Sequence, residues 1–222
     1  MMNAESPEPS VEDKPGTGPA VNPLLVLISA PSGGGKTTLC QQLLAARPEL
    51  TRAVTCTTRP PRAGEREGVD YHFLDVGSFL KRVHAGDFLE HATVYGNRYG
   101  MLKAEVLGKL RQGKDVLLNA DVQGAATIRE QAREDLELKR ALVSVFLTPP
   151  SMSILEGRLR KRATDSEAVI QKRLDVARQE IAQWKHFDYL LLSASIAEDL
   201  RRMLAIVEAE KMRSLRAPAP EF

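Results

Sequence analysis

The chain has 222 residues, of which 43% are hydrophobic and 27% charged, enough for one large or one subdivided globular unit. Its formal net charge of +2 predicts no overall attraction to nucleic acid or to an anionic membrane, so any basic site must be local. Cys40 and Cys56 lie far apart without C-x-x-C spacing, which favours a reducing compartment over a disulfide, and the histidines lack metal-ligand spacing.

Both ends of the chain are predicted to be unstructured tails. Residues 1–22 are rich in proline and acidic residues and hold almost no large apolar side chain, so they cannot offset the entropy of ordering. Residues 215–222 are a second tail, which leaves a folded domain at 23–214. We find no secretory signal, and the apolar run Leu24–Ile28 is too short to span a bilayer. We therefore expect a cytoplasmic protein that binds no membrane.

Strands and helices are expected to alternate through the domain. Continuous apolar runs predict buried strands at 24–29, 116–119, 142–147 and 189–192. Helices are expected at 36–46, 103–112, 151–162, 167–184 and from 196 onward. Thr164 and Glu167 form a capping box, and Trp184 closes the apolar stripe of that helix. The alternation predicts an α/β fold, a parallel sheet core flanked by helices.

Three consecutive glycines, in S-A-P-S-G-G-G-K-T-T-L (29–39), lie between the first strand and the first helix. Gly35, Lys36 and Thr37 match the end of the P-loop pattern G-x-x-x-x-G-K-[ST], and Ala30 replaces its first glycine. Backbone N–H groups of such a loop cradle phosphates, the lysine reaches the outer phosphates and the hydroxyl binds Mg²⁺. A flexible linker is the alternative, but a linker would not be fixed between a buried strand and a helix.

A second polar stretch, T-C-T-T-R-P-P-R-A-G-E-R-E-G-V-D-Y-H-F-L (55–74), places Arg59 and Arg62 around two stiff prolines, with Tyr71 a short loop later. Guanidinium groups held at a fixed spacing suit a phosphate that is gripped bidentately. With the P-loop, they indicate a second phosphate site facing the first. For either arginine alone, a solvated turn is the alternative.

The segment F-L-E-H-A-T-V-Y-G-N-R-Y-G (88–100) gathers Glu90, Tyr95, Asn97 and Tyr99 around glycines. A polar binding site and a glycine-broken pair of strands explain this spacing equally well, so the residues alone leave the choice open.

These motifs together resemble the guanylate kinases. The resemblance rests on S-A-P-S-G-G-G-K-T-T, T-T-R-P-P-R-A-G-E, G-x-D-Y-H-F, F-L-E-H-A, G-N-R-Y-G, D-V-Q-G and R-L-R-K-R-x-x-D-S-E, in family order over about 24–210. It implies phosphoryl transfer from ATP to GMP, giving ADP and GDP with Mg²⁺, in purine nucleotide metabolism. It also implies three parts: a P-loop kinase core (23–53, 106–156, 186–214), a GMP-binding insert (54–105) and a helical lid (157–185).

The resemblance assigns a role to each site residue. ATP would contact Ala30, Pro31, Ser32, Gly33, Gly34, Gly35, Lys36, Thr37 and Thr38, with Mg²⁺ on the Thr37 hydroxyl. The GMP phosphate would be held by Arg59, Arg62, Tyr71 and Tyr99. Guanine would be read by Glu90 and Asp121, with Thr55 near its O6. The catalytic set would be Lys36, Arg59, Arg158, Arg162 and Arg173, the last three coming from the lid to neutralise charge on the phosphoryl group.

Elementary chemistry agrees with these implied roles. Phosphoryl transfer requires aligned reactants and stabilised negative charge, and an anionic phosphate acceptor needs no general base. Arg158 and Arg162 are four residues apart, so on a helix they share a face. A snorkelling surface pair is the alternative for these two arginines. A closing lid would also exclude water from the reaction.

Three positions depart from the family pattern. Met101 replaces a serine or threonine, Asn119 replaces an acid that would lie near Mg²⁺, and Ser193 stands where an asparagine meets adenine. Two other functions remain open. A kinase of a ribose phosphate would not need Glu90 and Asp121 as a guanine-reading pair. A non-catalytic guanylate-kinase-like binding module would usually have lost the P-loop lysine and threonine, which are intact here. Protein partners and oligomeric state are not indicated.

Overall fold

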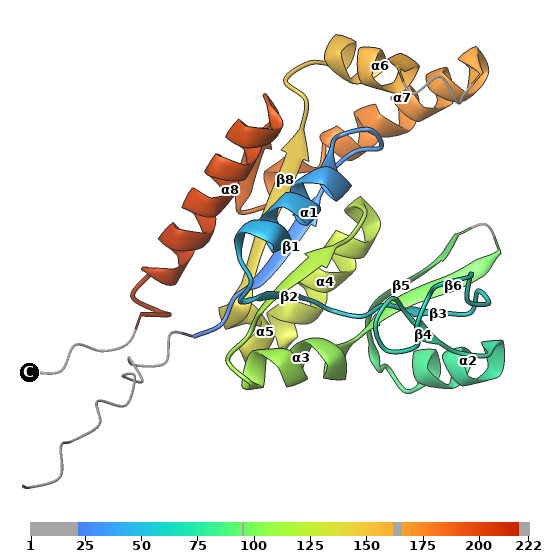
Figure 1. Cartoon of the computed structure of the whole chain (residues 1–222), viewed down its shortest axis with the longest axis vertical. Helices are drawn as coiled ribbons and strands as arrows, with labels where there is room; N and C mark the ends of the chain where they lie inside the picture. Colours follow the sequence, from blue (N-terminus) through green and yellow to red (C-terminus); the bar gives the residue numbers. More distant parts are fainter. Residues whose placement is uncertain (1–21, 95, 162–165, 218–222) are drawn as a thin grey trace, which may run out of the picture.

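The computed structural model describes residues 22–94, 96–161 and 166–217. Its core is a five-stranded sheet in the order β2-β7-β1-β8-β9, and all neighbouring strands run parallel (Figure 1). The strands are β1 (Leu25–Ser29), β2 (Leu50–Arg52), β7 (Asp115–Asn119), β8 (Leu142–Thr148) and β9 (Tyr189–Leu192). The predicted α/β fold is confirmed, and the four predicted strands begin and end within one residue of their expected bounds.

Helices cover both faces of this sheet because β1 alternates its apolar side chains. Leu25 and Leu27 pack on the face covered by α3, α4 and α5, whereas Val26 and Ile28 pack under α1 and α8. The helices are α1 (Lys36–Ala46), α3 (Lys103–Arg111), α4 (Val122–Glu134), α5 (Leu136–Ala141) and α8 (Ile196–Lys211). Within the described ranges, no helix has the length and apolar content needed to cross a membrane.

A second, four-stranded sheet in the order β4-β3-β6-β5 lies beside the core, with one helix packed on it (Figure 1). Its elements are β3 (Cys56–Thr57), β4 (His72–Phe73), α2 (Val76–His84), β5 (Phe88–Val94) and β6 (Asn97–Leu102). Strands β5 and β6 are antiparallel neighbours. The strand pair considered for 88–100 is therefore present, and it also carries Glu90, Asn97 and Tyr99, whereas Tyr95 lies outside the described residues.

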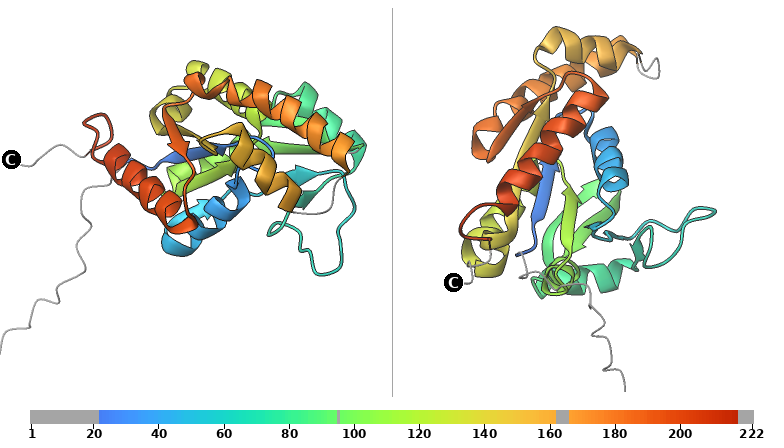
Figure 2. Two further views of the ribbon diagram at one scale, coloured as in Figure 1. Left: turned by 90° about the horizontal axis from the view of Figure 1, so that it is seen from above. Right: turned by 60° about the vertical axis from the view of Figure 1, so that its left-hand side comes forward.

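Two helices, α6 (Met152–Lys161) and α7 (Glu167–Ile181), form a pair that projects beyond the ends of β1 and β8 (Figures 1 and 2). Helix α7 ends before the expected residue 184, and a 3₁₀ turn follows at Trp184–His186. Trp184 is 47% exposed, so its place in the apolar stripe was wrong. The expected capping box was also wrong, because Ser166 is the N-cap residue of α7 and Glu167 pairs with Arg160; Thr164 lies outside the described residues.

The two ends of the described domain meet beside a buried ion pair. Arg216 contacts the carboxylate of Glu210 and donates to the carbonyls of Arg140 and Leu142, at the start of β8. The backbone N–H of Asn22 donates to the carbonyl of Arg216 at 3.4 Å. These contacts lie near the start of β1, whereas the P-loop follows the other end of that strand.

Candidate active site

The three glycines of the opening motif are each required by the shape of the P-loop. Gly33 and Gly35 have φ of +85° and +98°, which L side chains rarely adopt. A Cβ on Gly34 would lie 2.9 Å from the carbonyl oxygen of Pro31. The loop, residues 30–38, surrounds a cleft of about 290 Å³ that Asp121 and Glu180 also line. A glycine-rich backbone loop followed by a lysine at the start of a helix is the arrangement in which N–H groups and a cation bind phosphates.

Lys36 lies at the first turn of α1, where its ammonium group donates to the carbonyl of Ala120 at 2.7 Å. Burial lowers the pKa of Lys36, and the carboxylates of Asp121, Glu180 and Glu90 oppose that shift. The Lys36 ammonium group, with three acidic groups around it, can exchange the Ala120 carbonyl for the oxygens of a bound phosphate.

A second cleft of about 380 Å³ opens on the other side of the P-loop, lined by Gly33, Gly35, Thr38, Arg158, Ser193 and Asp199 among others. Arg158 donates to the Ser193 hydroxyl at 3.1 Å, and that hydroxyl donates to the buried Asp199 at 2.8 Å. This chain connects α6 to the start of α8, across the end of β9. The predicted lid residue Arg158 therefore lies beside the P-loop, and Ser193 lies in the cleft next to it.

Arg59, Tyr71 and Tyr99 come together on the second sheet. The Arg59 guanidinium lies over the Tyr71 ring at 5.4 Å, and the two tyrosine rings are 6.2 Å apart. Nη2 of Arg59 also donates to both carboxylate oxygens of Glu65, at 2.8 and 2.9 Å, and Glu65 accepts from the backbone N–H of Arg62. The Arg59 guanidinium is the main cause that lowers the pKa of Glu65. A carboxylate thus already occupies one nitrogen of the guanidinium that was expected to hold phosphate, and Nη1 donates to the carbonyl of Pro60 at 2.7 Å.

Glu90, on β5, and Asp121, at the start of α4, approach the same turn of backbone. A Cβ on Gly124 would lie 3.1 Å from Glu90 Oε2 and 3.4 Å from Asp121 Oδ1. Asp121 caps α4 by accepting from the Gly124 N–H at 2.7 Å. Burial, and secondarily the Asp121 charge, raises the pKa of Glu90 to about 7. The structure therefore brings these two predicted acceptors together from different sheets.

Four other residues from the sequence analysis lie in a loop, in a turn, on α7 and on β7. Thr55 lies in the loop before β3, partly buried, and Arg62 is exposed on its turn. Arg173 is partly buried on α7, and Arg162 lies outside the described residues. Asn119 is exposed at the end of β7.

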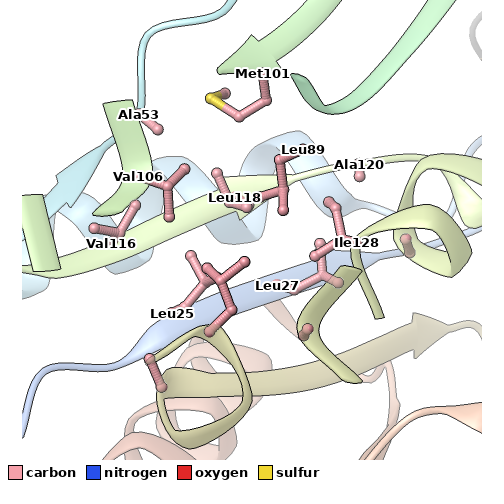
Figure 3. Close-up of a cluster of buried hydrophobic side chains, with 14 of the residues drawn as sticks. Leu25, Leu27, Ala53, Leu89, Met101, Val106, Val116, Leu118, Ala120 and Ile128 are labelled. Atoms are coloured by element: carbon pink, nitrogen blue, oxygen red, sulfur yellow. The ribbon is translucent and has the colours of Figure 1, made fainter. Parts of the chain in front are cut away.

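Met101, which departs from the family pattern, is buried in the core. It is 7% exposed and belongs to the cluster that contains Leu89, Val106 and Leu118 (Figure 3). Its side chain therefore fills the space between the second sheet and the core, and a hydroxyl there would point into apolar surroundings.

Sequence reasoning missed three acidic residues of the site: Glu65, Glu180 and Asp199. Glu65 stood within a quoted motif, so its spacing from Arg59 could have indicated the pair. Glu180 and Asp199 lie on helix faces and meet the P-loop and Ser193 only through tertiary packing. No local pattern signals such contacts.

Comparisons with known proteins agree with this geometry. The family model described as guanylate kinase matches residues 22–210. The guanylate kinase of Coxiella burnetii is 44% identical over 189 residues, covering 85% of this chain and 88% of that protein. That of Alcanivorax borkumensis is 44% identical over 195 residues, covering 88% and 91%. A crystal structure of guanylate kinase from Anaplasma phagocytophilum superposes with a TM-score of 0.66 at 34% identity, covering 89% of this chain and 90% of that one. The match of the family model over residues 22–210 and this extent of similarity place the chain in the guanylate kinase family.

Proposed function

We propose that this protein transfers the terminal phosphoryl group of ATP to GMP, giving ADP and GDP. The observation that carries the proposal is the position of Asp121. Asp121 lines the P-loop cleft and also faces Glu90, so one residue borders both the donor and the acceptor site. A kinase needs this adjacency, because its acceptor phosphate must meet the terminal phosphoryl group in line.

Each site residue then has a chemical task. Arg59, Tyr71 and Tyr99 hold the GMP phosphate after Glu65 yields its place on the guanidinium. Glu90 and Asp121 accept from the N1–H and amino group of guanine. Lys36 and the loop N–H groups hold the ATP phosphates, and Arg158 adds positive charge beside Gly35. The acceptor phosphate is itself the nucleophile, so no general base is needed.

Magnesium fits the donor set as a partner of the nucleotide. Among the described residues, no group of three or more His, Cys, Asp or Glu side chains could hold a metal by itself. Mg²⁺ is usually held by one or two protein oxygens together with substrate phosphates. The exposed Thr37 hydroxyl at the start of α1 would supply such an oxygen. When bound, Mg²⁺ would neutralise charge on the transferred group.

We also propose that the three predicted parts act as moving units. The second sheet with α2 corresponds to the GMP-binding insert, 54–105, and the lid, 157–185, takes in the second half of α6 and all of α7. Closure of both over the core would exclude water, which otherwise competes for the phosphoryl group.

An assay of ADP release coupled to NADH oxidation, with GMP, AMP, UMP and ribose bisphosphate as alternative acceptors, tests this proposal. We expect GMP to support turnover and the others to be poor acceptors. A preference for ribose bisphosphate would indicate the sugar-phosphate kinase alternative, and no turnover with any acceptor would indicate the binding-module alternative.

A further inference from the structure

A carboxylate from the lid reaches the phosphate cradle. Glu180 lies one residue before the end of α7, and its Oε2 accepts from the backbone N–H of Ser32 at 3.3 Å. Ser32 belongs to the P-loop, and Glu180 lines the same cleft as Gly33, Gly34 and Lys36. The last turn of α7 is therefore tied to the loop that receives the donor phosphates.

The groups around the Glu180 carboxylate are those of a site that binds anions. Lys36 attracts its carboxylate, whereas Asp121 repels it. The carboxylate is about half buried, and burial raises the pKa of Glu180. The Ser32 N–H and the Lys36 charge favour its presence here, and these are the kinds of group that bind phosphate.

Helices α6 and α7 form one packed unit. They share an apolar cluster formed by Leu155, Leu159, Ile170, Leu174 and Ala177. Leu159 also reaches the P-loop, since a Cβ on Gly33 would lie 2.9 Å from its Cδ2. The helix pair thus rests on the loop through an apolar contact and, at Glu180, through a polar one.

We propose that the Glu180 carboxylate takes the place of a phosphate group and ties the lid to the P-loop in the nucleotide-free protein, and that the outermost phosphate of ATP must displace it. This inference rests on the proposed function, because it takes ATP as the ligand of the cradle. Two anions cannot share the Ser32 N–H and the Lys36 charge without strong repulsion. Glu180 is accordingly a positioning residue: it sets the resting place of α7 and opposes ATP, rather than touching the reacting atoms in the transition state.

The test is the affinity of the full-length protein for ATP and for ADP, measured by isothermal titration calorimetry with Mg²⁺ and without GMP, so that no phosphoryl group is transferred. The variant Glu180→Gln keeps the size of the side chain and removes its charge. Asp175→Asn is the matched control, because Asp175 loses the same charge on the same helix but is exposed and paired with Arg178.

We expect Glu180→Gln to bind ATP about tenfold more tightly than the wild type, as removal of one nearby like charge in a partly buried site predicts. The gain for ADP should be smaller, since ADP lacks the outermost phosphate, and Asp175→Asn should match the wild type. Glu180→Ala should shift ATP affinity in the same direction. Thermal unfolding without nucleotide checks that each variant is folded.

Weaker ATP binding by Glu180→Gln and Glu180→Ala would overturn the proposal and make Glu180 a ligand of the nucleotide. Unchanged affinity, or equal gains for ATP and ADP, would also overturn it. In each of these cases the wild type still binds ATP, so the proposed function stands. A wild type that binds no ATP would overturn both.

Discussion

At the scale of single residues, Glu90 and Asp121, the two proposed acceptors for guanine, differ in their surroundings. One oxygen of Asp121 already accepts from the Gly124 N–H and caps α4. Glu90 is mostly buried, and its pKa is raised to about 7. A bound guanine would donate two hydrogen bonds to these carboxylates and so favour the ionised form of Glu90. Acceptor selectivity should therefore depend mainly on Glu90.

We predict that Glu90→Gln reduces the preference for GMP over AMP by about tenfold or more. Hydrogen bonds to charged groups contribute roughly 1.5–3 kcal/mol, and an amide cannot accept as strongly as a carboxylate. The measurement is kcat/KM for both acceptors. Asp87→Asn, which removes a charge just before β5 at an exposed position, is the control and should leave selectivity unchanged. Unchanged selectivity in Glu90→Gln would contradict the guanine-reading role.

The same substitution should stabilise the protein without ligands at alkaline pH. The folded protein holds the Glu90 proton more tightly than the unfolded chain, so stability falls as the pH rises from about 4.5 to about 7. Glu90→Gln removes this loss, which amounts to roughly 3–4 kcal/mol because one pKa unit corresponds to about 1.4 kcal/mol. The increase in Tm should thus be larger at pH 8 than at pH 5. Equal increases at both pH values would show that the buried charge is not the cause.

At the scale of elements, the sequence predicted best where local pattern alone decides. The core strands are continuous apolar runs, and the P-loop is a short motif in a fixed context, so both were located correctly. The two-residue strands β3 and β4 exist only through pairing with β6 and with each other, and no local signal marks them. Helix α4 was missed because its apolar residues are mostly small.

The lid offers a prediction at this scale. Arg173→Ala should lower kcat by about tenfold or more while changing the KM for ATP and GMP much less, because positive charge from α7 is needed most in the transition state. Lys172→Ala, an exposed neighbour on the same helix, is the matched control and should leave kcat near the wild-type value. Steady-state kinetics with both substrates varied measures the effect. A change confined to the KM for ATP would make Arg173 a binding residue.

At the scale of the whole molecule, stability depends on a buried pair far from the P-loop. Arg216 and Glu210 each have about 3% of the side chain exposed, and Tyr189 donates to the same carboxylate at 2.6 Å. Arg216→Ala would leave Glu210 buried without its main partner, which costs about 3–5 kcal/mol. Arg213→Ala should cost less than about 1 kcal/mol, since Arg213 is 54% exposed and lies 3.3 Å from the same carboxylate.

Urea unfolding of both variants measures this difference, and kcat with GMP should stay near the wild-type value wherever the protein is folded. Similar losses for the two arginines would mean that the burial of Arg216 contributes little to its effect.

The contact between Asn22 and Arg216 means that the chain could be circularly permuted. Because these two positions already touch, a short peptide could bridge them, and new ends could be opened in the exposed turn at Gly113, between α3 and β7. Such a circular permutant would keep the order of strands in the sheet and both nucleotide cradles. It would, however, begin with β7 and Asp121 and end with α3, so that the P-loop came late in synthesis rather than first.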